Sequence, residues 1–193
     1  MADSAYLRQR FSGSSWGGGG GETPCGSGST VAYTEFLRDA IPPILETYDI
    51  KVLNDAGCGD MNWISLLASE FETAGVDYLG YDVRTLVDPP LPYEKLEIVH
   101  ERMRPCDLIL CKDVFIHLPD EMVLTALANF RAVSKYLLST TFPLVEHGSE
   151  RAIRGLGGGF ARINLEDPRY GLGEPLEAVA EPQWQKNIAL WKL

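Results

Sequence analysis

The chain has 193 residues, of which 45% are hydrophobic and 23% charged, and its formal net charge is −10. This length and composition are typical of one globular domain, and without a run of about 18 apolar residues no membrane span is expected. The acidic balance argues against a nucleic-acid substrate, because proteins that bind a phosphate backbone concentrate Lys and Arg in a basic stripe.

The N-terminal segment, residues 1–29, is rich in Gly and Ser and includes an unbroken glycine run over residues 17–21. It lacks the apolar stretch of a secretory signal. Its composition is typical of a disordered tail. The apolar side chains of Phe11 and Trp16 favour a second interpretation, a flexible flap that orders over a bound ligand. Both interpretations remain open.

Strands and helices alternate through the central part of the chain. Apolar residues at helical spacing predict a helix over residues 30–48, which Pro42 and Pro43 should kink or split. The predicted strands are residues 51–55, 77–82, 96–100, 107–111 and 136–140, and the other predicted helices are residues 60–73 and a segment that opens at Pro119. This alternation indicates an α/β fold whose parallel sheet is covered on both faces.

Residues 143–186 break this pattern, since they hold many Gly and Pro residues and little periodicity. A long irregular stretch in a compact domain is usually functional, so we expect a lid, with a possible short strand at residues 160–164. The run 188–191 predicts a last strand. The four cysteines form no C-x-x-C pair, which favours neither a zinc site nor a disulfide framework and suits a reducing cytoplasm.

The most specific signal is the sequence Asp55-Ala56-Gly57-Cys58-Gly59-Asp60, where the first predicted strand ends. Glycines between a strand and a helix let the backbone approach a ligand, and the helix start offers unpaired N–H groups. Asp82, at the end of the second strand, can accept hydrogen bonds from two ribose hydroxyls. A dinucleotide fingerprint needs a third glycine, but Asn62 holds that position. The pattern favours a nucleoside ligand without a pyrophosphate, although an ordinary turn remains the simpler alternative.

This D-x-G-x-G-D sequence resembles motif I of the class I S-adenosyl-L-methionine (SAM)-dependent methyltransferases, with Asp82 at their acidic ribose position. Residues 106–118 look like the family's fourth strand and the loop after it. A subset of small bacterial and phage-type methyltransferases is especially similar, because it tends to share Cys-Gly-Asp-x-Asn-Trp (here 58–63), Gly-Ser-Gly-Ser (26–29) and a terminal Leu-Trp strand (190–191).

The resemblance implies a single Rossmann-like domain, residues 30–193, with a doubly wound, mostly parallel seven-stranded sheet whose last strand is antiparallel. It implies SAM as the methyl donor and S-adenosyl-L-homocysteine (SAH) as the product, with residues 143–186 as the acceptor-binding lid. The implied cofactor-binding residues are Asp55, Gly57, Cys58, Gly59, Asp60, Trp63, Asp82, Val83, Cys111 and Lys112. Asp60 has an alternative, compatible role as the N-cap of the following helix.

Methyl transfer requires positioning of donor and acceptor, and a base where the acceptor must lose a proton. His117 is the first candidate for this base, because imidazole titrates near neutral pH and the residue follows the fourth strand. It could instead cap or support the next helix. Asp113 is the rival base, or an orienting partner of His117.

Three functions remain open on the sequence. The first is methyl transfer to a small-molecule or glycan acceptor, at oxygen if His117 is the base. The second is a non-catalytic module that binds SAM or a nucleotide and needs neither His117 nor Asp113. The third, an NAD-type oxidoreductase, is disfavoured by the missing third glycine.

Overall fold

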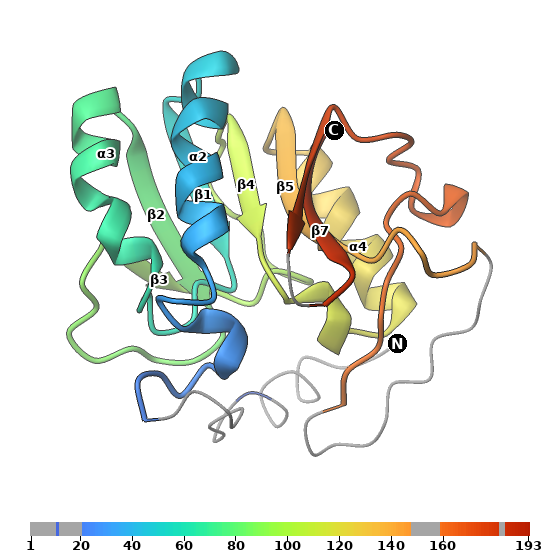
Figure 1. Ribbon diagram of the computed structural model, residues 1–193, viewed down its shortest axis with the longest axis horizontal. Helices are drawn as coiled ribbons and strands as arrows, with labels where there is room; N and C mark the ends of the chain where they lie inside the picture. Colours follow the sequence, from blue (N-terminus) through green and yellow to red (C-terminus); the bar gives the residue numbers. More distant parts are fainter. Residues whose placement is uncertain (1–10, 12–20, 148–158, 182–183) are drawn as a thin grey trace.

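The computed structural model describes residue 11 and residues 21–147, 159–181 and 184–193. Its centre is a seven-stranded sheet in the order β3-β2-β1-β4-β5-β7-β6 (Figure 1). The strands are β1 (Val52–Ala56), β2 (Asp77–Asp82), β3 (Tyr93–Lys95), β4 (Leu108–Cys111), β5 (Tyr136–Thr141), β6 (Glu177–Glu181) and β7 (Lys186–Lys192). Neighbouring strands are parallel except that β7 runs antiparallel to β5 and β6. The predicted fold, including its antiparallel last strand, is confirmed.

Helices cover both faces of this sheet (Figure 1). One face carries α2 (Glu35–Thr47), η2 (Ile64–Leu67) and α3 (Ala68–Ala74), and the other carries α4 (Asp120–Arg131). Successive side chains of a strand point to opposite faces. On β4, Leu108 and Leu110 therefore pack with α2, whereas Ile109 and Cys111 pack with α4. Burial on both faces explains why this strand is apolar throughout.

The strand order also defines where a ligand site should lie. The chain leaves β1 towards β2 and β3 on one side and continues with β4 and β5 on the other side. In open α/β sheets the loops at the carboxyl ends of the strands separate at such a point and leave a crevice. The short helices η1 (Ser27–Ser29) and η3 (Phe115–His117) lie beside this crevice, and η4 (Pro168–Tyr170) precedes β6. In the part of the chain that the structure describes, no helix is long and apolar enough to cross a membrane.

Three strand predictions were wrong. The third strand is β3 at residues 93–95, and residues 96–100 follow it without strand structure, because their apolar side chains line a cavity or fill the core. Residues 160–164 form no strand. Conversely β6 lies inside the stretch expected to be irregular; most of its residues are exposed, so it lacked an apolar pattern.

The helix predictions were too long. The first helix begins at Glu35 rather than residue 30, and residues 60–73 become a turn followed by η2 and α3. Pro42 and Pro43 do not split α2. A proline inside a helix costs about 3 kcal/mol, but α2 buries Leu37, Ile41 and two further apolar residues against the sheet, and Pro43 faces solvent. The packing outweighs the local preference.

The domain boundaries remain an expectation. Most of the predicted flap, residues 1–10 and 12–20, lies outside the described residues, as do residues 148–158 and 182–183 of the predicted lid. Residues 22–29, here called the strap, are described and cross the edge of the sheet where the crevice lies.

Candidate active site

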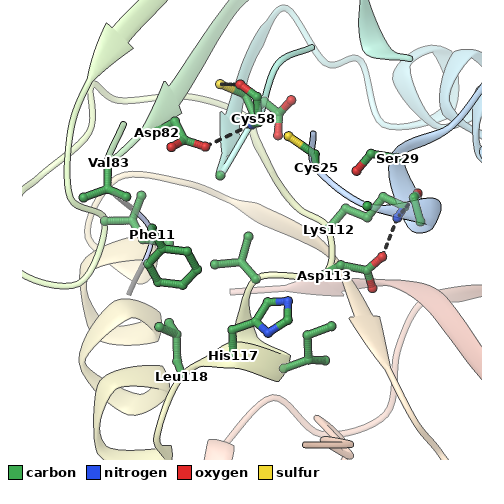
Figure 2. Close-up of a pocket in the computed structure, with 18 of the residues that line it drawn as sticks. Phe11, Cys25, Ser29, Cys58, Asp82, Val83, Lys112, Asp113, His117 and Leu118 are labelled. Atoms are coloured by element: carbon green, nitrogen blue, oxygen red, sulfur yellow. Dashed lines mark hydrogen bonds and ion pairs between the residues drawn. The ribbon is translucent and has the colours of Figure 1, made fainter. Parts of the chain in front are cut away.

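A cavity of about 420 Å³ occupies the crevice at the carboxyl ends of the parallel strands. Figure 2 shows its two sides, with the strap, Lys112 and Asp113 on one side and Phe11, His117 and Leu118 on the other. Eight of the ten predicted cofactor-binding residues line it, and so do both candidate bases, Asp113 and His117. The sequence motifs therefore converge on one cavity.

The glycine loop after β1 is held tightly against its neighbours. The N–H groups of Gly57 and Cys58 both donate to the Tyr81 carbonyl, at 2.8 and 3.0 Å. Gly57 has a φ of +86°, and a Cβ added there would lie 2.3 Å from Cγ2 of Val114. Only glycine fits this position. The loop consequently presents bare backbone to the cavity.

Asp82 ends β2 and is nearly buried, with 7% exposed. Its Oδ1 accepts hydrogen bonds from the backbone N–H and the Nε of Arg84, at 2.9 and 3.0 Å. Its Oδ2 accepts from the Gly59 N–H at 3.1 Å and from Nη2 of Arg84 at 3.2 Å. The neighbouring Val83 also lines the cavity. Asp82 thus lies where the motif predicts, with its carboxylate already engaged.

Asp55 lies below the glycine loop and is 3% exposed. The pKa of its carboxyl is raised to about 7, chiefly by burial. A hydrogen bond from the Tyr78 hydroxyl at 2.8 Å opposes this shift, and the charge of nearby Asp82 adds to it. A carboxyl with such a pKa changes charge near neutrality. A cationic ligand in the cavity would favour its ionised form.

Two predicted cofactor residues, Asp60 and Cys111, do not line the cavity. The Asp60 carboxylate accepts from Thr23 Oγ1 at 2.7 Å and from the Asn62 N–H at 3.2 Å, so it fastens the strap and caps its own turn. Cys111 is fully buried in the core beside α4. Trp63 is also largely buried, but part of it reaches the cavity wall.

A charged cluster forms the strap side of the cavity. Asp113 accepts from Lys112 Nζ at Oδ2 (2.5 Å) and from Lys186 Nζ and Thr140 Oγ1 at Oδ1 (2.7 and 3.0 Å). The two lysines are only 9% and 6% exposed. Burial alone would raise the pKa of Asp113, but both ammonium groups outweigh it and hold the pKa well below its usual range. Asp113 is therefore a permanent anion shared by two buried cations.

Tyr33 and Glu181 extend this cluster. Both lysine Nζ atoms lie 5.8 Å from the centre of the Tyr33 ring, and the Tyr33 hydroxyl donates to Glu181 Oε1, which also pairs with Lys186 at 3.2 Å. Burial and Glu181 raise the pKa of Tyr33 well above its usual range. Among the described residues, the buried Oε2 of Glu181 has no hydrogen-bond partner. The cluster balances two positive charges with two negative ones.

His117 belongs to η3 and is half-buried. Its Nδ1 lies 3.0 Å from the Gly159 carbonyl oxygen, and its ring forms a T-shaped contact with the Phe11 ring, with 6.4 Å between the ring centroids. A carbonyl only accepts hydrogen bonds, so Nδ1 carries the proton and Nε2 of the neutral ring does not. This tautomer is the one in which Nε2 can accept a proton. The contact also ties η3 to residue 159 beyond β5.

Sequence reasoning missed several cavity residues. They are Cys25, Gly28, Tyr33, Arg84 and Lys186, with Glu181 behind them. Arg84 could have been identified, since it follows the motif residue Asp82 by two positions. Gly28 belongs to the Gly-Ser-Gly-Ser motif, which had no assigned role in the site. The other four had no local signal, because they reach the cavity only through the course of the strap and the order of the strands.

Comparison with solved structures supports the fold. The magnesium protoporphyrin IX methyltransferase ChlM from Synechocystis PCC 6803, with bound SAH, matches with a TM-score of 0.57 and 15% identity over 83% of this chain and 84% of that chain. A SAM-dependent methyltransferase from Clostridium acetobutylicum ATCC 824 matches with a TM-score of 0.56 and 12% identity over 82% and 91%.

Human N-acetylserotonin methyltransferase, in complex with SAM, matches with a TM-score of 0.53 and 12% identity over 81% of this chain but only 54% of that one. The chain likewise spans about half of several other matched methyltransferases, 55–57% of their length. No family model matches the sequence. No curated protein matches it either. At these identities the likeness establishes the fold of the methyltransferases.

Proposed function

We propose that the chain is a class I SAM-dependent methyltransferase that methylates a small-molecule acceptor at oxygen. One observation carries the proposal: the methyltransferase-like sheet holds a cavity at the point between β1 and β4, and Gly57, Gly59 and Asp82 line it. The resemblance to the small bacterial and phage-type subset rests on sequence motifs alone. The structural neighbours with bound SAM or SAH support the same cofactor.

The charges of the cavity favour SAM over NAD. With Asp55 in the ionised form that a cationic ligand favours, the acidic lining residues Asp55, Asp82, Glu97 and Asp113 outnumber the basic residues Arg84, Lys112 and Lys186. SAM carries a net positive charge, whereas NAD brings an anionic pyrophosphate. The residue at the third-glycine position, Asn62, binds the strap instead, through Nδ2 to Glu22 Oε1 and Ser29 O.

In this proposal the loop from Asp55 to Gly59, with Trp63, Asp82, Val83 and Lys112, holds the cofactor. When bound, SAM supplies an electrophilic methyl group, so the acceptor needs alignment and the loss of its proton. We assign proton removal to Nε2 of His117, because the Gly159 carbonyl fixes the proton on Nδ1. Asp113 is a poor base, since its two lysines hold its pKa low. We assign it the positioning of Lys112 and Lys186.

The lining on the acceptor side favours a flat, largely apolar molecule over a glycan. Phe142 and Phe160 meet edge to face at 5.9 Å, and Phe160 and Trp184 line the cavity while 44% and 51% exposed. Polar side chains on this side are mostly engaged with one another, so several sugar hydroxyls would lack partners. The described parts of residues 143–186 thus suit the role of an acceptor lid. We further propose a cytoplasmic location, which the four free cysteines support.

Binding of SAH, with NAD as the control ligand, tests the cofactor. A ligand at about 100 times its Kd adds about 2.7 kcal/mol, which corresponds to a rise in Tm of about 5–10 °C for a domain of this size. Stabilisation by SAH and not by NAD is expected. Stabilisation by NAD alone would overturn the proposal.

His117→Gln tests the base. With methyl-labelled SAM and a panel of phenols, aromatic acids and free sugars, the variant should lose about 100-fold in turnover while its Kd for SAH stays unchanged. His147→Gln is the matched control, because His147 is exposed and outside the cavity lining. Full activity of the His117 variant refutes the assignment. A parent protein that binds SAH but methylates nothing favours the non-catalytic alternative.

A further inference from the structure

The carboxylate of Asp82 has no vacant acceptor position. A carboxylate offers about four lone-pair sites, and four N–H groups occupy them. Two of these donors are backbone N–H groups, from Gly59 to Oδ2 and from Arg84 to Oδ1. They leave one site on each oxygen. The guanidinium of Arg84 fills both remaining sites, with Nε on Oδ1 and Nη2 on Oδ2.

We propose that Arg84 is an internal competitor for the cofactor, which must displace its side chain before the ribose hydroxyls can bind Asp82. This inference rests on the proposed function, since it takes the ribose of SAM and SAH as the ligand group. The two sites that Arg84 fills, one on each oxygen, match the two hydroxyls of a ribose. The backbone donors stay in place and continue to orient the carboxylate.

The location of Arg84 supports competition rather than a remote supporting role. Its side chain is 20% exposed, lines the cavity and forms a forked ion pair with the buried carboxylate of Asp82. Forked pairs of this kind are the stronger charge-assisted hydrogen bonds. Any ligand with a ribose diol must therefore offset the loss of the pair. A ligand without the diol leaves it intact and gains nothing from Asp82.

Arg84 also links Asp82 to the strap. Its Nη2 lies 3.4 Å from Sγ of Cys25, and the same sulfur accepts from the Asp60 N–H at 3.3 Å. Displacement of the guanidinium consequently removes one of the contacts that fasten the strap over the cavity. Return of Arg84 to Asp82 restores it and opposes rebinding of the product. Arg84 thereby sets the affinity for SAH and its rate of release.

Calorimetric titration with SAH, together with a dissociation-rate measurement, tests this competition. Arg84→Met removes every side-chain donor but keeps the backbone N–H on Oδ1. It should bind SAH about tenfold more tightly and release it more slowly, because the ribose no longer has to displace a charge-assisted, forked hydrogen-bonded pair. The Kd of Arg84→Lys for SAH should lie between those of the parent and Arg84→Met, because lysine cannot form the forked pair. A merely structural arginine would weaken binding when it is removed.

The double variant Asp82→Asn/Arg84→Met separates the mechanism from other effects. In the Asp82→Asn background, Arg84→Met should no longer increase the affinity for SAH, since Arg84 competes with the cofactor for the Asp82 carboxylate. Arg104→Met is the matched control: Arg104 also pairs with an aspartate, Asp77 at 2.8 Å, but at the opposite end of β2. Its Kd for SAH should equal that of the parent.

The outcomes distinguish the two proposals. Weaker or unchanged SAH binding by both Arg84 variants, with a parent that binds SAH, overturns the competition and leaves the proposed function standing. The competition is also overturned if Arg84→Met increases the affinity for SAH equally in the parent and Asp82→Asn backgrounds. Absence of SAH binding to the parent and to every variant overturns the proposed function and this inference together.

Discussion

Asp113→Asn removes one charge from the cluster of Lys112, Asp113, Lys186 and Glu181 and changes little else. Asp113 has a φ of +56°, in the left-handed region that Asn tolerates as well as Asp does. Two lysines that are 9% and 6% exposed would lose their shared counter-ion. Breaking a buried ion pair by removing one partner costs about 3–5 kcal/mol. We therefore expect a drop in Tm of about 10 °C.

The pH dependence of this loss has a defined sign. The folded-state pKa of Asp113 is held below its unfolded value of about 3.9. Its contribution to stability is fully present above about pH 4 and is lost as the pH falls through the lower, folded-state pKa. The difference between parent and variant should be constant from about pH 5 to 8 and shrink below about pH 4.

Urea unfolding at several pH values measures this difference, provided that the slope with denaturant stays unchanged. Asp77→Asn is the control, because Asp77 is 64% exposed and pairs with Arg104 at the surface. Exposed pairs contribute about 0–1 kcal/mol. If Asp113→Asn costs no more than Asp77→Asn at pH 7, the two lysines are solvated well enough to stand alone, and the reasoning fails.

Two further predictions concern the glycine loop. The pKa of Asp55 is raised to about 7, so its contribution to stability is present below about pH 4 and lost as the pH rises through 7. The free energy of unfolding of the parent should therefore fall by a few kcal/mol between about pH 4 and about pH 7, and this fall should be smaller in Asp55→Asn. Urea titrations at several pH values measure the difference. Gly57→Ala should lower the Tm by several degrees, and Val114→Ala in the same chain should recover part of the loss, since it removes the atom 2.3 Å from the new Cβ but not the strain at φ +86°. A Gly57→Ala protein as stable as the parent would contradict the second prediction.

The sequence was most informative where chemistry is concentrated in a short loop. The run from Asp55 to Gly59 and the strand-ending Asp82 predicted a nucleoside site, and all of these residues except Ala56 line one cavity. Local patterns sufficed because the geometry is local. Gly57, with its φ of +86°, follows β1, and Asp82 ends β2, the strand that pairs with β1; only η2 and α3 lie between these two strands in the sequence.

The strand predictions were wrong where buried apolar residues and strand-forming residues are not the same residues. The apolar residues Leu96, Ile98 and Val99 fill the core and the cavity wall and lie outside any strand, whereas residues 93–95 form the edge strand that pairs with β2. An edge strand with little buried surface has no apolar alternation to detect. The same is true of β6, which pairs only with β7 among the described strands. The sequence pattern therefore did not reveal the backbone pairing of the strands at either edge of the sheet.

The acceptor side of the cavity follows from the direction of β7. An antiparallel strand brings its first residue, not its last, to the edge where parallel strands end, so Lys186 meets Asp113 there. β6 runs parallel to β5, and its last residue, Glu181, therefore reaches the same edge and pairs with Lys186. The sequence predicted an antiparallel last strand but began it at residue 188, two residues too late to include Lys186. A last strand predicted to begin at Lys186 would have placed a cation opposite Asp113. That placement would also have explained why Asp113 is unsuited to act as a base.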